Sequence, residues 1–457
     1  MGKTKFDFDY LVIGSGPAGG TAALMAAKAG LKVALIESDK WGGPSINSVD
    51  VPYRAALNFA HLYTKSIRGL RFGISSSNLR YNYPTAQNWQ VFAARRASKD
   101  IKKNFENAGI ECIRGSAHFL SPYEIAVGQK RISSNKILIA TGATLAESGI
   151  SGLDYIEHYT SKNALNIGRP PKTLVVIGGG STGCEIAQYY AELGSKVVIL
   201  ELTDRLLPRE DLEVGQLMTQ HFEENHHIKV LAESRAISIE QDKINKRVVF
   251  MRGGVERTLH TDAIVVATGS RPDIEDLGLE NAGVKAAKKG IKVNKMLQTS
   301  IKHIYAAGDA IDANSSTERA IYEGALATSN LFNRNKDTAN YDGFMRTTDT
   351  YPQIATVGIT EDDCLKRDKK FKKTIVPLSS VASSNTNDFY VGFVKMIADK
   401  QGKVLGATVI CPEAEQVAQE VVIALRHHLS VEDLASAPHP NYSWNDAVRL
   451  AANRLSF

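Results

Sequence analysis

Residues 11–37 read LVIGSGPAGGTAALMAAKAGLKVALIE, and this stretch decides the fold of the chain. An apolar run suited to a buried strand leads into three glycines spaced G-x-G-x-x-G, and a helical stretch and a second apolar strand follow. Gly14 permits a tight turn, Gly16 lets a pyrophosphate approach the backbone, and Gly19 lets the helix pack closely on the strand. Glu37 ends the second strand, where a carboxylate can accept both ribose hydroxyls of an adenosine. The stretch therefore predicts a strand–turn–helix–strand unit that binds a dinucleotide.

The same unit occurs a second time, in LVVIGGGSTGCEIAQYYAELGSKVVILE at residues 174–201. One constant shift along the chain superimposes the two units without a gap. The superimposed pairs are Gly14 with Gly178, Gly16 with Gly180, Gly19 with Gly183, and Glu37 with Glu201. Chance does not place two such units at matching internal spacing. We therefore predict an α/β fold with two nested Rossmann-like domains, one for each of two dinucleotides.

Composition places the chain among ordinary globular proteins. It has 457 residues, of which 43% are hydrophobic and 23% charged, and this length leaves room for about three domains. The start of the chain lacks an apolar signal segment and no stretch reaches the length of a membrane span, so we expect a cytoplasmic protein with no membrane partner. The net charge is +6, but Lys and Arg are dispersed, which favours a mixed solvated surface over nucleic-acid binding.

Cysteines and histidines form no pattern typical of a disulfide or a metal site. Cys112, Cys184, Cys364 and Cys411 are far apart, and none belongs to a C-x-x-C motif. Cys184 starts a predicted helix, which could lower the pKa of its thiol, but a small residue packed between helix and sheet is the favoured interpretation. The histidines at positions 226, 227, 427 and 428 are interpreted as solvated helix ends rather than metal ligands. No metal site is predicted.

The segment 38–54, SDKWGGPSINSVDVPYR, resembles the active-site helix of the flavoprotein disulfide reductases. This family includes dihydrolipoamide dehydrogenase, glutathione reductase and mercuric reductase, and its pattern is W-G-G-T-C-L-N-V-G-C-I-P-S-K. The matching positions are Trp41, Gly42, Gly43, Asn47 and Pro52. Ser45 stands in the place of the first redox cysteine, Asp50 in the place of the second, and Arg54 where the family has a lysine beside the flavin. No dithiol can therefore form at these positions.

The resemblance also implies which residues bind the cofactors. The first fingerprint is expected to bind FAD and the second NAD(P)H, and Gly42 and Gly43 bring backbone close to a phosphate. Ala117, in GSAHF at 115–119, matches a strand that contacts adenine in the family, and Gly308 and Asp309, in HIYAAGDA at 303–310, match the motif that holds the ribityl chain. Apolar strands also lead into two A-T-G turns. The cofactor-binding residues expected in these turns are Thr141, Gly142 and Gly269.

The domain organisation follows from the same resemblance. It implies an FAD-binding domain from 1–149 and 276–344, an NAD(P)-binding domain from 150–275, and an α+β interface domain from 345–457. In the family the interface domain forms a homodimer and supplies the active-site base of the partner subunit. Residues 85–110 are expected to form one amphipathic helix within the FAD-binding domain.

The family carries this base in a motif of the form H-x-H-P-T-x-S-E-A. The ungapped match starts at His439, and it puts Asn441 in the position of the base and Asp446 in that of the supporting glutamate. Asn441 cannot carry a proton. A gapped match would give the base role to His439, but the ungapped one is favoured because AVRLAANRL continues the helix in register. We expect these three residues to face the flavin of the other subunit.

The departures from the family pattern point to altered chemistry. Disulfide reduction needs a thiolate nucleophile and an acid or base, and this chain matches neither. The hypothesis is therefore an FAD-dependent NAD(P)H:acceptor oxidoreductase that passes electrons to a quinone or another small diffusible acceptor. A soluble pyridine nucleotide transhydrogenase of the same superfamily is one alternative. A catalytically idle module that binds FAD and NAD is another, and no motif names the acceptor.

Two further expectations concern charged side chains. NADH is expected to be preferred over NADPH, because the carboxylate of Glu201 accepts a ribose 2′-hydroxyl but repels a 2′-phosphate, although Arg205 could swing toward such a phosphate. Arg54 is expected to pair with Glu185, in place of the lysine and glutamate that lie near the flavin in the family. Asp50, one helical turn from Arg54, is a competing partner.

Overall fold

The computed structural model describes all residues except 1–5, 76–78, 243–244, 314 and 457. The chain divides into two compact units, each built from three segments. The first unit comprises Met1–Tyr53, Asn88–Glu147 and Gly269–Tyr341, and the second comprises Arg54–Gln87, Ser148–Thr268 and Asp342–Phe457. Each fingerprint therefore lies in a unit of its own. The second unit also contains the C-terminal segment, and the division into three domains stays a prediction.

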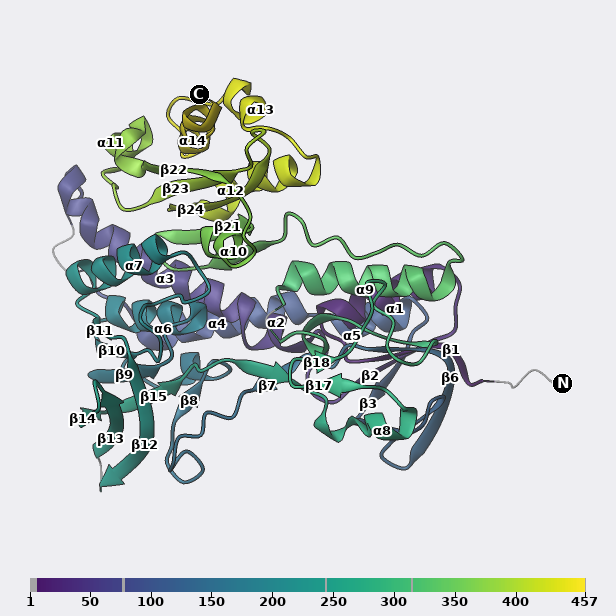
Figure 1. Ribbon diagram of the computed structural model, residues 1–457. Helices are drawn as coiled ribbons and strands as arrows, with labels where there is room; N and C mark the ends of the chain where they lie inside the picture. The colour runs from purple at the N-terminus through teal and green to yellow at the C-terminus, as the bar shows by residue number, and fades with distance from the viewer. Residues whose placement is uncertain (1–5, 76–78, 243–244, 314, 457) are drawn as a thin grey trace. The chain divides into compact units, whose positions relative to one another are not determined.

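A seven-stranded sheet forms the centre of the first unit (Figure 1). Strands β3, β2, β1, β6 and β19 run parallel, and β4 and β5 continue the sheet from β6 as an antiparallel meander. The strands are β1 (Phe8–Ile13), β2 (Val33–Glu37), β3 (Glu111–Arg114), β4 (Ala117–Ser121), β5 (Glu124–Val127), β6 (Lys130–Ile139) and β19 (Ile304–Ala306). With α1 (Pro17–Lys28) between β1 and β2, the predicted strand–turn–helix–strand unit is confirmed.

Both faces of this sheet are covered. Tyr10 and Val12 of β1 pack against α1, α5 and α9, whereas Leu11 and Ile13 pack against the β4–β5 hairpin and α8. All four side chains are buried, as the apolar run of a doubly covered parallel strand predicts. The other elements of this unit are α2 (Gly43–Asn47), α5 (Ile101–Asn107), β7 (Ala143–Leu145), β16 (Ser270–Pro272), α8 (Leu279–Ala282), β17 (Ala286–Ala287), β18 (Gly290–Ile291) and α9 (Thr317–Phe332).

The second fingerprint forms an all-parallel sheet of five strands, in the order β11-β10-β9-β15-β8. Helices α6 and α7 pack on this sheet, and a three-stranded antiparallel sheet shares an apolar core with it. The elements are β8 (Tyr159–Thr160), β9 (Thr173–Ile177), α6 (Ser181–Glu192), β10 (Lys196–Leu200), α7 (Leu212–Asn225), β11 (Lys229–Leu231), β12 (Ser234–Asp242), β13 (Asn245–Arg252), β14 (Val255–Thr261) and β15 (Ala263–Val266). The predicted repeat is thus confirmed as a second unit of the same architecture.

The C-terminal segment forms an antiparallel sheet of five strands with helices packed on it, so the predicted α+β character is confirmed. The strand order is β20-β21-β24-β23-β22. The elements are β20 (Met345–Thr348), β21 (Gln353–Gly358), α10 (Glu361–Lys366), β22 (Lys372–Pro377), α11 (Ala382–Asn387), β23 (Phe393–Ala398), β24 (Val404–Cys411), α12 (Ala414–Arg426), α13 (Val431–Ser436) and α14 (Asp446–Ser456).

Two longer helices lie between the fingerprints. Helix α3 (Asp50–Arg68) contains Pro52 in its first turn, where a missing amide hydrogen costs nothing. The prediction of one helix over 85–110 is wrong. Helix α4 (Tyr83–Ser98) ends before α5 begins, and Asp100 between them has a φ of +62°, a left-handed conformation that a right-handed helix cannot contain.

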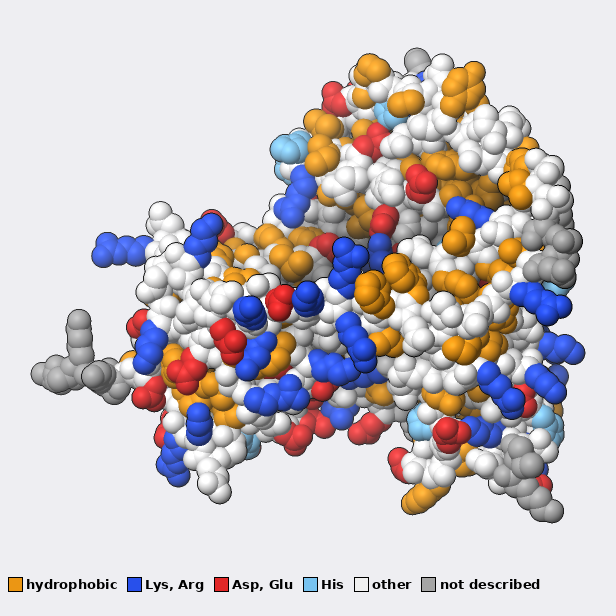
Figure 2. All heavy atoms as spheres, turned by 180° about the vertical axis from the view of Figure 1, so that it is seen from behind, with side chains coloured by type: hydrophobic (Ala, Val, Ile, Leu, Met, Phe, Trp, Pro, Cys, Tyr) orange, Lys and Arg blue, Asp and Glu red, His pale blue; other side chains and the backbone are white. Residues whose placement is uncertain are grey.

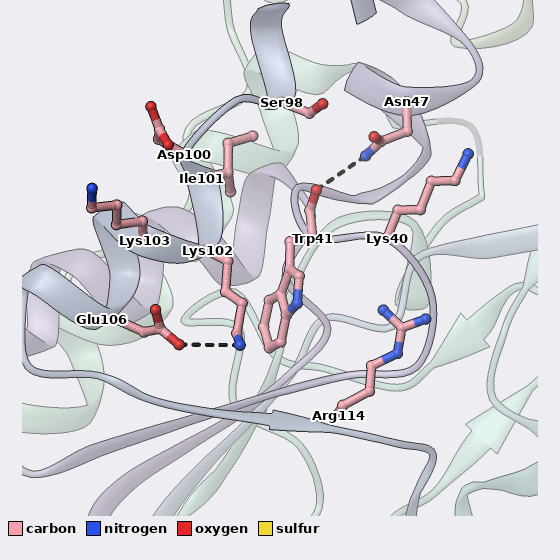
Figure 3. Close-up of a pocket in the computed structure, with 10 residues that line it drawn as sticks. All are labelled: Lys40, Trp41, Asn47, Ser98, Asp100, Ile101, Lys102, Lys103, Glu106 and Arg114. Atoms are coloured by element: carbon pink, nitrogen blue, oxygen red, sulfur yellow. Dashed lines mark hydrogen bonds and ion pairs between the residues drawn. The ribbon is translucent and has the colours of Figure 1, made fainter. Parts of the chain in front are cut away.

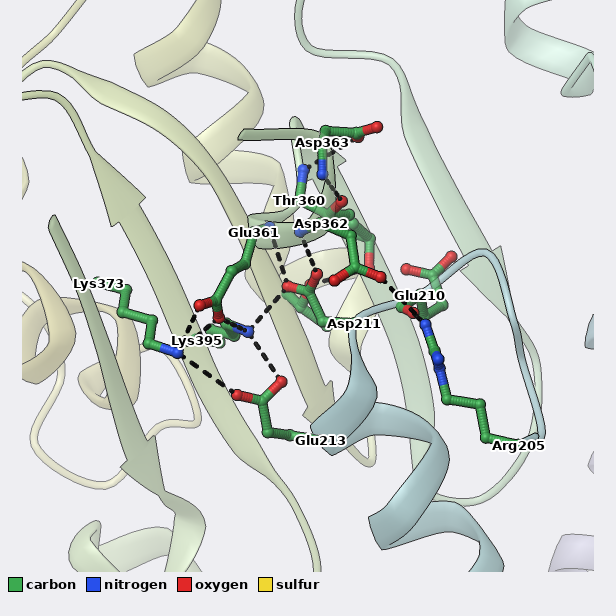
Figure 4. Close-up of polar contacts among 12 residues, drawn as sticks. Arg205, Glu210, Asp211, Glu213, Thr360, Glu361, Asp362, Asp363, Lys373 and Lys395 are labelled. Carbon is green, nitrogen blue, oxygen red and sulfur yellow. Dashed lines mark hydrogen bonds and ion pairs between the residues drawn. The ribbon is translucent and has the colours of Figure 1, made fainter. Parts of the chain in front are cut away.

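A buried ion-pair cluster joins the start of α7 to the C-terminal sheet (Figure 4). The Nζ atom of Lys395, a residue with 1% of its side chain exposed, lies 3.0 Å from Asp211, 2.8 Å from Glu213 and 2.7 Å from Glu361. Burial alone would lower the pKa of Lys395, but the hydrogen bonds to these carboxylates raise it overall. Lys373, which is exposed, reaches Glu361 at 2.6 Å. These five residues are the Lys395 cluster.

Charged side chains of both signs are interspersed on the face shown in Figure 2. This distribution agrees with the mixed surface that the composition favours. Among the described residues, no helix is long and apolar enough to cross a membrane.

Candidate dinucleotide sites and the residues around them

The first glycine turn is shaped by close backbone packing. Gly14 has a φ of +99°, and a Cβ atom at this position would overlap the carbonyl oxygen of Ala140. A Cβ atom at Gly19 would overlap the carbonyl oxygen of Gly14, so α1 packs on the turn as the fingerprint predicts. Gly16, in contrast, faces open space, and it precedes α1 without a side-chain cap. The free amide groups of the first helical turn are thus available to an anion.

Glu37 is held at the end of β2 by the same turn. Its carboxylate accepts hydrogen bonds from the Ser15 amide at 2.9 Å, the Ser15 hydroxyl at 2.6 Å and the Asp39 amide at 2.7 Å. The Ser15 hydroxyl in turn accepts from the Gly42 amide at 3.0 Å. Because these bonds fix the carboxylate beside the glycine turn, Glu37 stays the predicted ribose ligand.

The second fingerprint repeats this hydrogen-bond pattern. Glu201 accepts from the Gly179 amide at 2.6 Å and from the Thr203 amide at 2.7 Å, the counterparts of the Ser15 and Asp39 contacts. A Cβ atom at Gly183 would overlap the carbonyl oxygen of Gly178, and Gly180 faces open space before the uncapped start of α6. The repeat seen in the sequence therefore extends to the geometry of the two turns.

Further features of the first unit fit a bound dinucleotide. The hydroxyl oxygen of Thr141 is buried and has no hydrogen-bond partner among the described residues, so a polar ligand group would satisfy it. A Cβ atom at Gly43 would lie 2.8 Å from the Cα atom of Gly16, which places Gly42 and Gly43 against the predicted phosphate site. Gly142 and Gly269 have φ values of +79° and +110° and face open space. Gly42, Gly43, Thr141 and Gly142 fit FAD, and Gly269, predicted within the NAD(P)-binding segment 150–275, lies in the same unit as they do.

The Gly308–Asp309 turn is fixed by a residue that the sequence reasoning missed. Glu323 of α9 is fully buried, and its carboxylate accepts from the Gly308 amide at 2.7 Å, from Arg319 at 2.8 Å and from the Tyr341 hydroxyl at 2.9 Å. Burial, and after it the nearby Asp312, raises the pKa of Asp309 from 3.8 to about 7. At neutral pH this carboxyl group can thus donate or accept a hydrogen bond.

Ser45 and Asp50, the residues predicted to replace the redox cysteines of the family, belong to a hydroxyl–carboxylate cluster. One oxygen of Asp50 accepts hydrogen bonds from Ser45 at 2.6 Å and from Thr317 at 2.7 Å. The two hydroxyl oxygens are 3.3 Å apart, and all three residues are half-buried. Ser45 comes from α2, Asp50 begins α3 and Thr317 begins α9. Thr317 was missed because it lies far from the other two in sequence.

Arg54, in the second unit, is bound by two carboxylates. Its guanidinium lies 3.1 Å from Asp349 and 2.8 Å from Glu415. Glu185 accepts a hydrogen bond from the Asp349 amide at 2.8 Å, so Asp349 contacts both residues that we expected to pair. The direct pair between Arg54 and Glu185 stays a prediction, and Asp349 and Glu415 are contacts that the sequence did not indicate.

The predicted base region is also in the second unit. Nε2 of His439 lies 2.7 Å from Glu420, and its Nδ1 lies 2.7 Å from the carbonyl oxygen of Ala437, so both ring nitrogens face acceptors. Asn441 is exposed, whereas Asp446 is buried and bonds Arg449 at 2.7 Å. Which of His439 and Asn441 takes the base position stays a prediction.

A hollow with four basic side chains lies at the end of β3, the strand that carries Arg114 (Figure 3). The ring of Trp41 lies between Lys102 and Arg114, and Lys102 pairs with Glu106 at 3.1 Å. The amide nitrogen of Asn47 donates to the carbonyl oxygen of Trp41 at 3.0 Å and so holds the loop. The lining residues of the hollow are Lys40, Trp41, Asn47, Ser98, Asp100, Ile101, Lys102, Lys103, Glu106 and Arg114.

The four cysteines are free thiols, and three of them are fully buried. Burial, and after it Glu185, raises the pKa of Cys184 well above 9.0, so this residue is a packed small side chain as favoured, not an activated thiolate. Burial raises the pKa of Cys411 to about 12 and, with Glu106, that of Cys112 to about 11. Among the described residues, no group of His, Cys, Asp and Glu side chains is arranged to hold a metal ion.

The solvated-end interpretation is wrong for one of the four histidines. His227, His427 and His428 are exposed, but His226 packs on the buried His221, with 3.3 Å between their Nε2 atoms. Gln188 of α6 contacts His226 at 3.2 Å and the carbonyl oxygen of Tyr351 at 2.9 Å. The histidine pair thus lies in a packed contact between α6, α7 and the turn before β21.

This pair predicts acid sensitivity. Burial, and after it His221, lowers the pKa of His226 from 6.5 to about 3. Between pH 6.5 and pH 3, His226 is protonated in the unfolded chain but not in the folded chain. Its contribution to the free energy of unfolding is therefore fully present above pH 6.5 and decreases as the pH falls below that value. Going from pH 7.5 to 5 should cost about 2 kcal/mol through this residue. Urea unfolding at both pH values should show the loss, and His226→Gln should reduce it. An unchanged loss in the variant would contradict the assignment.

Comparisons with known proteins agree with this geometry. Residues 8–324 match the family described as pyridine nucleotide-disulphide oxidoreductase, and residues 345–452 match its dimerisation domain. The chain is 31% identical to the mercuric reductase of Staphylococcus aureus, covering 98% of this chain and 82% of that protein. It is 28% identical to a dihydrolipoyl dehydrogenase of Bacillus subtilis, and the match covers 99% of this chain and 97% of that protein. The solved structure of LpdA from Mycobacterium tuberculosis matches with a TM-score of 0.88 at 25% identity, covering 98% of this chain and 99% of that one.

Proposed function

Because the chain belongs to the pyridine nucleotide-disulphide oxidoreductase family of flavin-dependent enzymes, we propose that it is an FAD-dependent NAD(P)H:acceptor oxidoreductase working without a redox disulfide. The observation that supports this proposal is the cluster of Ser45, Asp50 and Thr317, which contains the two residues predicted to replace the redox cysteines. Hydroxyl and carboxylate groups cannot store electrons as a dithiol does. The electrons therefore pass directly to a small diffusible acceptor, and quinones are the class to test first.

Each unit contributes its own binding residues to this proposal. In the first unit, the start of α1 would bind the pyrophosphate of FAD, and Glu37 would bind the adenosine ribose. Thr141 would bind a polar group of the cofactor, and Asp309 would bind its ribityl chain. Bound FAD would accept two electrons from a nicotinamide and release them singly or as a pair. In the second, the start of α6 and Glu201 bind the nicotinamide dinucleotide.

An anaerobic screen of NADH oxidation tests the proposal. The acceptors are quinones, nitro compounds, dyes, metal ions, lipoamide and an NADP analogue. Turnover with quinones and none with lipoamide is the expected result. Fastest turnover with the NADP analogue would establish a transhydrogenase instead. A flavoprotein that turns over with no acceptor would be an idle binding module, and fast turnover with lipoamide would contradict the proposal.

A preference for NADH belongs to the proposal. The carboxylate of Glu201 repels a 2′-phosphate, and the guanidinium of Arg205, which could neutralise one, is bound by Asp362 at 3.0 Å and Asp204 at 3.2 Å. We expect kcat/KM for NADH to exceed that for NADPH at least tenfold, or about 1.4 kcal/mol. Asp362→Asn, which removes one of the two carboxylates that bind Arg205, should narrow the ratio of kcat/KM for NADH to kcat/KM for NADPH. Equal or better efficiency of the wild type with NADPH would contradict this preference.

We further propose a homodimer built on residues 345–457. The match of residues 345–452 to the dimerisation domain of the family supports it. In such a dimer His439, Asn441 and Asp446 would face the flavin of the other subunit. Sedimentation at micromolar concentration should give the mass of two chains, and a monomer would contradict the proposal.

A further inference from the structure

The cluster of Ser45, Asp50 and Thr317 connects two segments that are predicted to bind FAD. The first segment contains Gly43 and Ser45, and the second runs from Asp309 to Thr317. Its first segment packs on the pyrophosphate turn, because a Cβ atom at Gly43 would lie 2.8 Å from the Cα atom of Gly16. Its second segment follows the ribityl motif, since Thr317 begins the helix after Asp309. The cluster therefore adjoins both of the segments that are predicted to bind FAD.

The hydrogen bonds of Asp50 suit an anion. Both hydroxyls donate to the same carboxylate oxygen, at 2.6 Å from Ser45 and 2.7 Å from Thr317, and an ionised carboxylate is the group that accepts two such bonds. Asp50 also lies in the first turn of α3, where the helix dipole favours negative charge. The site thus holds one fixed negative charge, whereas a redox disulfide is neutral until it is reduced to thiols.

We propose that Asp50 tunes the bound flavin, making it a stronger reductant by holding a permanent negative charge close to its ring. This inference rests on the proposed function, because it requires FAD in the first unit. Reduction adds electrons to the ring, and a nearby fixed anion makes that addition less favourable. Electrons then leave the flavin more readily for the acceptor. Asp50 is in this sense a redox-tuning residue, and Ser45 and Thr317 position its carboxylate.

The midpoint potential of the bound flavin tests this role, since a merely structural cap on α3 would change stability and leave the potential alone. The holoprotein is titrated spectroelectrochemically without NADH or any acceptor. Asp50→Asn removes the charge and keeps the size of the side chain. It should raise the midpoint potential by at least about 30 mV, which for a two-electron couple is a tenfold change in the equilibrium constant of reduction. Ser45→Ala, which removes one of the two hydroxyls that position the carboxylate but keeps the charge, should shift the potential by less than Asp50→Asn does.

A second variant keeps the test open if Asp50→Asn loses FAD. Ser45→Asp adds a carboxylate at the same place and should shift the potential in the opposite direction. An Asp50→Asn potential equal to or below that of the wild type, or a Ser45→Asp potential above it, would overturn the inference. Failure of the proposed function has a different signature, because it would appear in the acceptor screen or as extra reducing equivalents in the wild type.

Discussion

Lys395→Met should lower the free energy of unfolding of the second unit by about 3–5 kcal/mol, the cost of breaking a buried ion pair by removing one partner. Methionine fills nearly the same volume but leaves Asp211, Glu213 and Glu361 around an uncharged side chain. The three carboxylates lie 2.7–3.0 Å from the Lys395 nitrogen, and that side chain is 1% exposed. The variant removes the only cation that the described structure places within this distance of all three.

Lys373→Met is the matched control for this prediction. Lys373 pairs with the same Glu361 at 2.6 Å, but 43% of its side chain is exposed. An exposed pair is worth at most about 1 kcal/mol, so this variant should unfold close to the wild type. Denaturant unfolding followed by fluorescence compares the two. Equal losses in both variants would show that burial does not decide the strength of the Lys395 cluster.

Substitutions at the third glycine of each fingerprint should separate the two cofactors. Gly19→Ala places a methyl group onto the carbonyl oxygen of Gly14, and Gly183→Ala does the same at Gly178. Alanine gains about 1 kcal/mol of helix propensity, but pushing a helix off its strand costs more, typically 1–3 kcal/mol and the loss of the phosphate-binding geometry. Gly19→Ala should therefore be purified without flavin. Gly183→Ala should retain FAD but lose its reduction by NADH.

Each of these variants controls for the other, and Gly16→Ala adds a third comparison. A Cβ atom at Gly16 meets nothing within 4 Å, so this variant should fold like the wild type and lose FAD affinity only through its clash with the pyrophosphate. Flavin absorbance of the purified proteins and anaerobic reduction by NADH give the readouts. Retention of FAD by Gly19→Ala would contradict the fingerprint assignment.

The two fingerprints could be predicted from the sequence because they are demands of the local backbone. Gly14 and Gly178 must adopt positive φ, and Gly19 and Gly183 must admit a neighbouring carbonyl group, so the residue type itself records the geometry. The same holds for the apolar strands on either side. The family pattern around Ser45 and Asp50 also predicted that these two residues lie in the same part of the chain as the first fingerprint, and both are in the first unit.

The residues that sequence reasoning missed act over long range. Thr317 contacts Asp50, Glu323 holds the Gly308 amide, and Asp349 binds Arg54, each through a pairing that only the folded chain brings together. No local pattern marks such partners, because a Thr, Glu or Asp near a helix start most often acts as a cap. The break at Asp100 was missed for a related reason, since a non-glycine residue in a left-handed conformation is rare.

The central claim is that this flavoprotein stores electrons on its flavin alone. Anaerobic titration of the holoprotein with dithionite tests it most directly. We expect one two-electron equivalent per flavin to bleach the flavin absorbance, with no thiolate-to-flavin charge-transfer band at any stage. Uptake of a second equivalent per flavin, abolished when the cysteines are alkylated, would contradict the account and show that Cys112, Cys184, Cys364 or Cys411 contributes to a working dithiol.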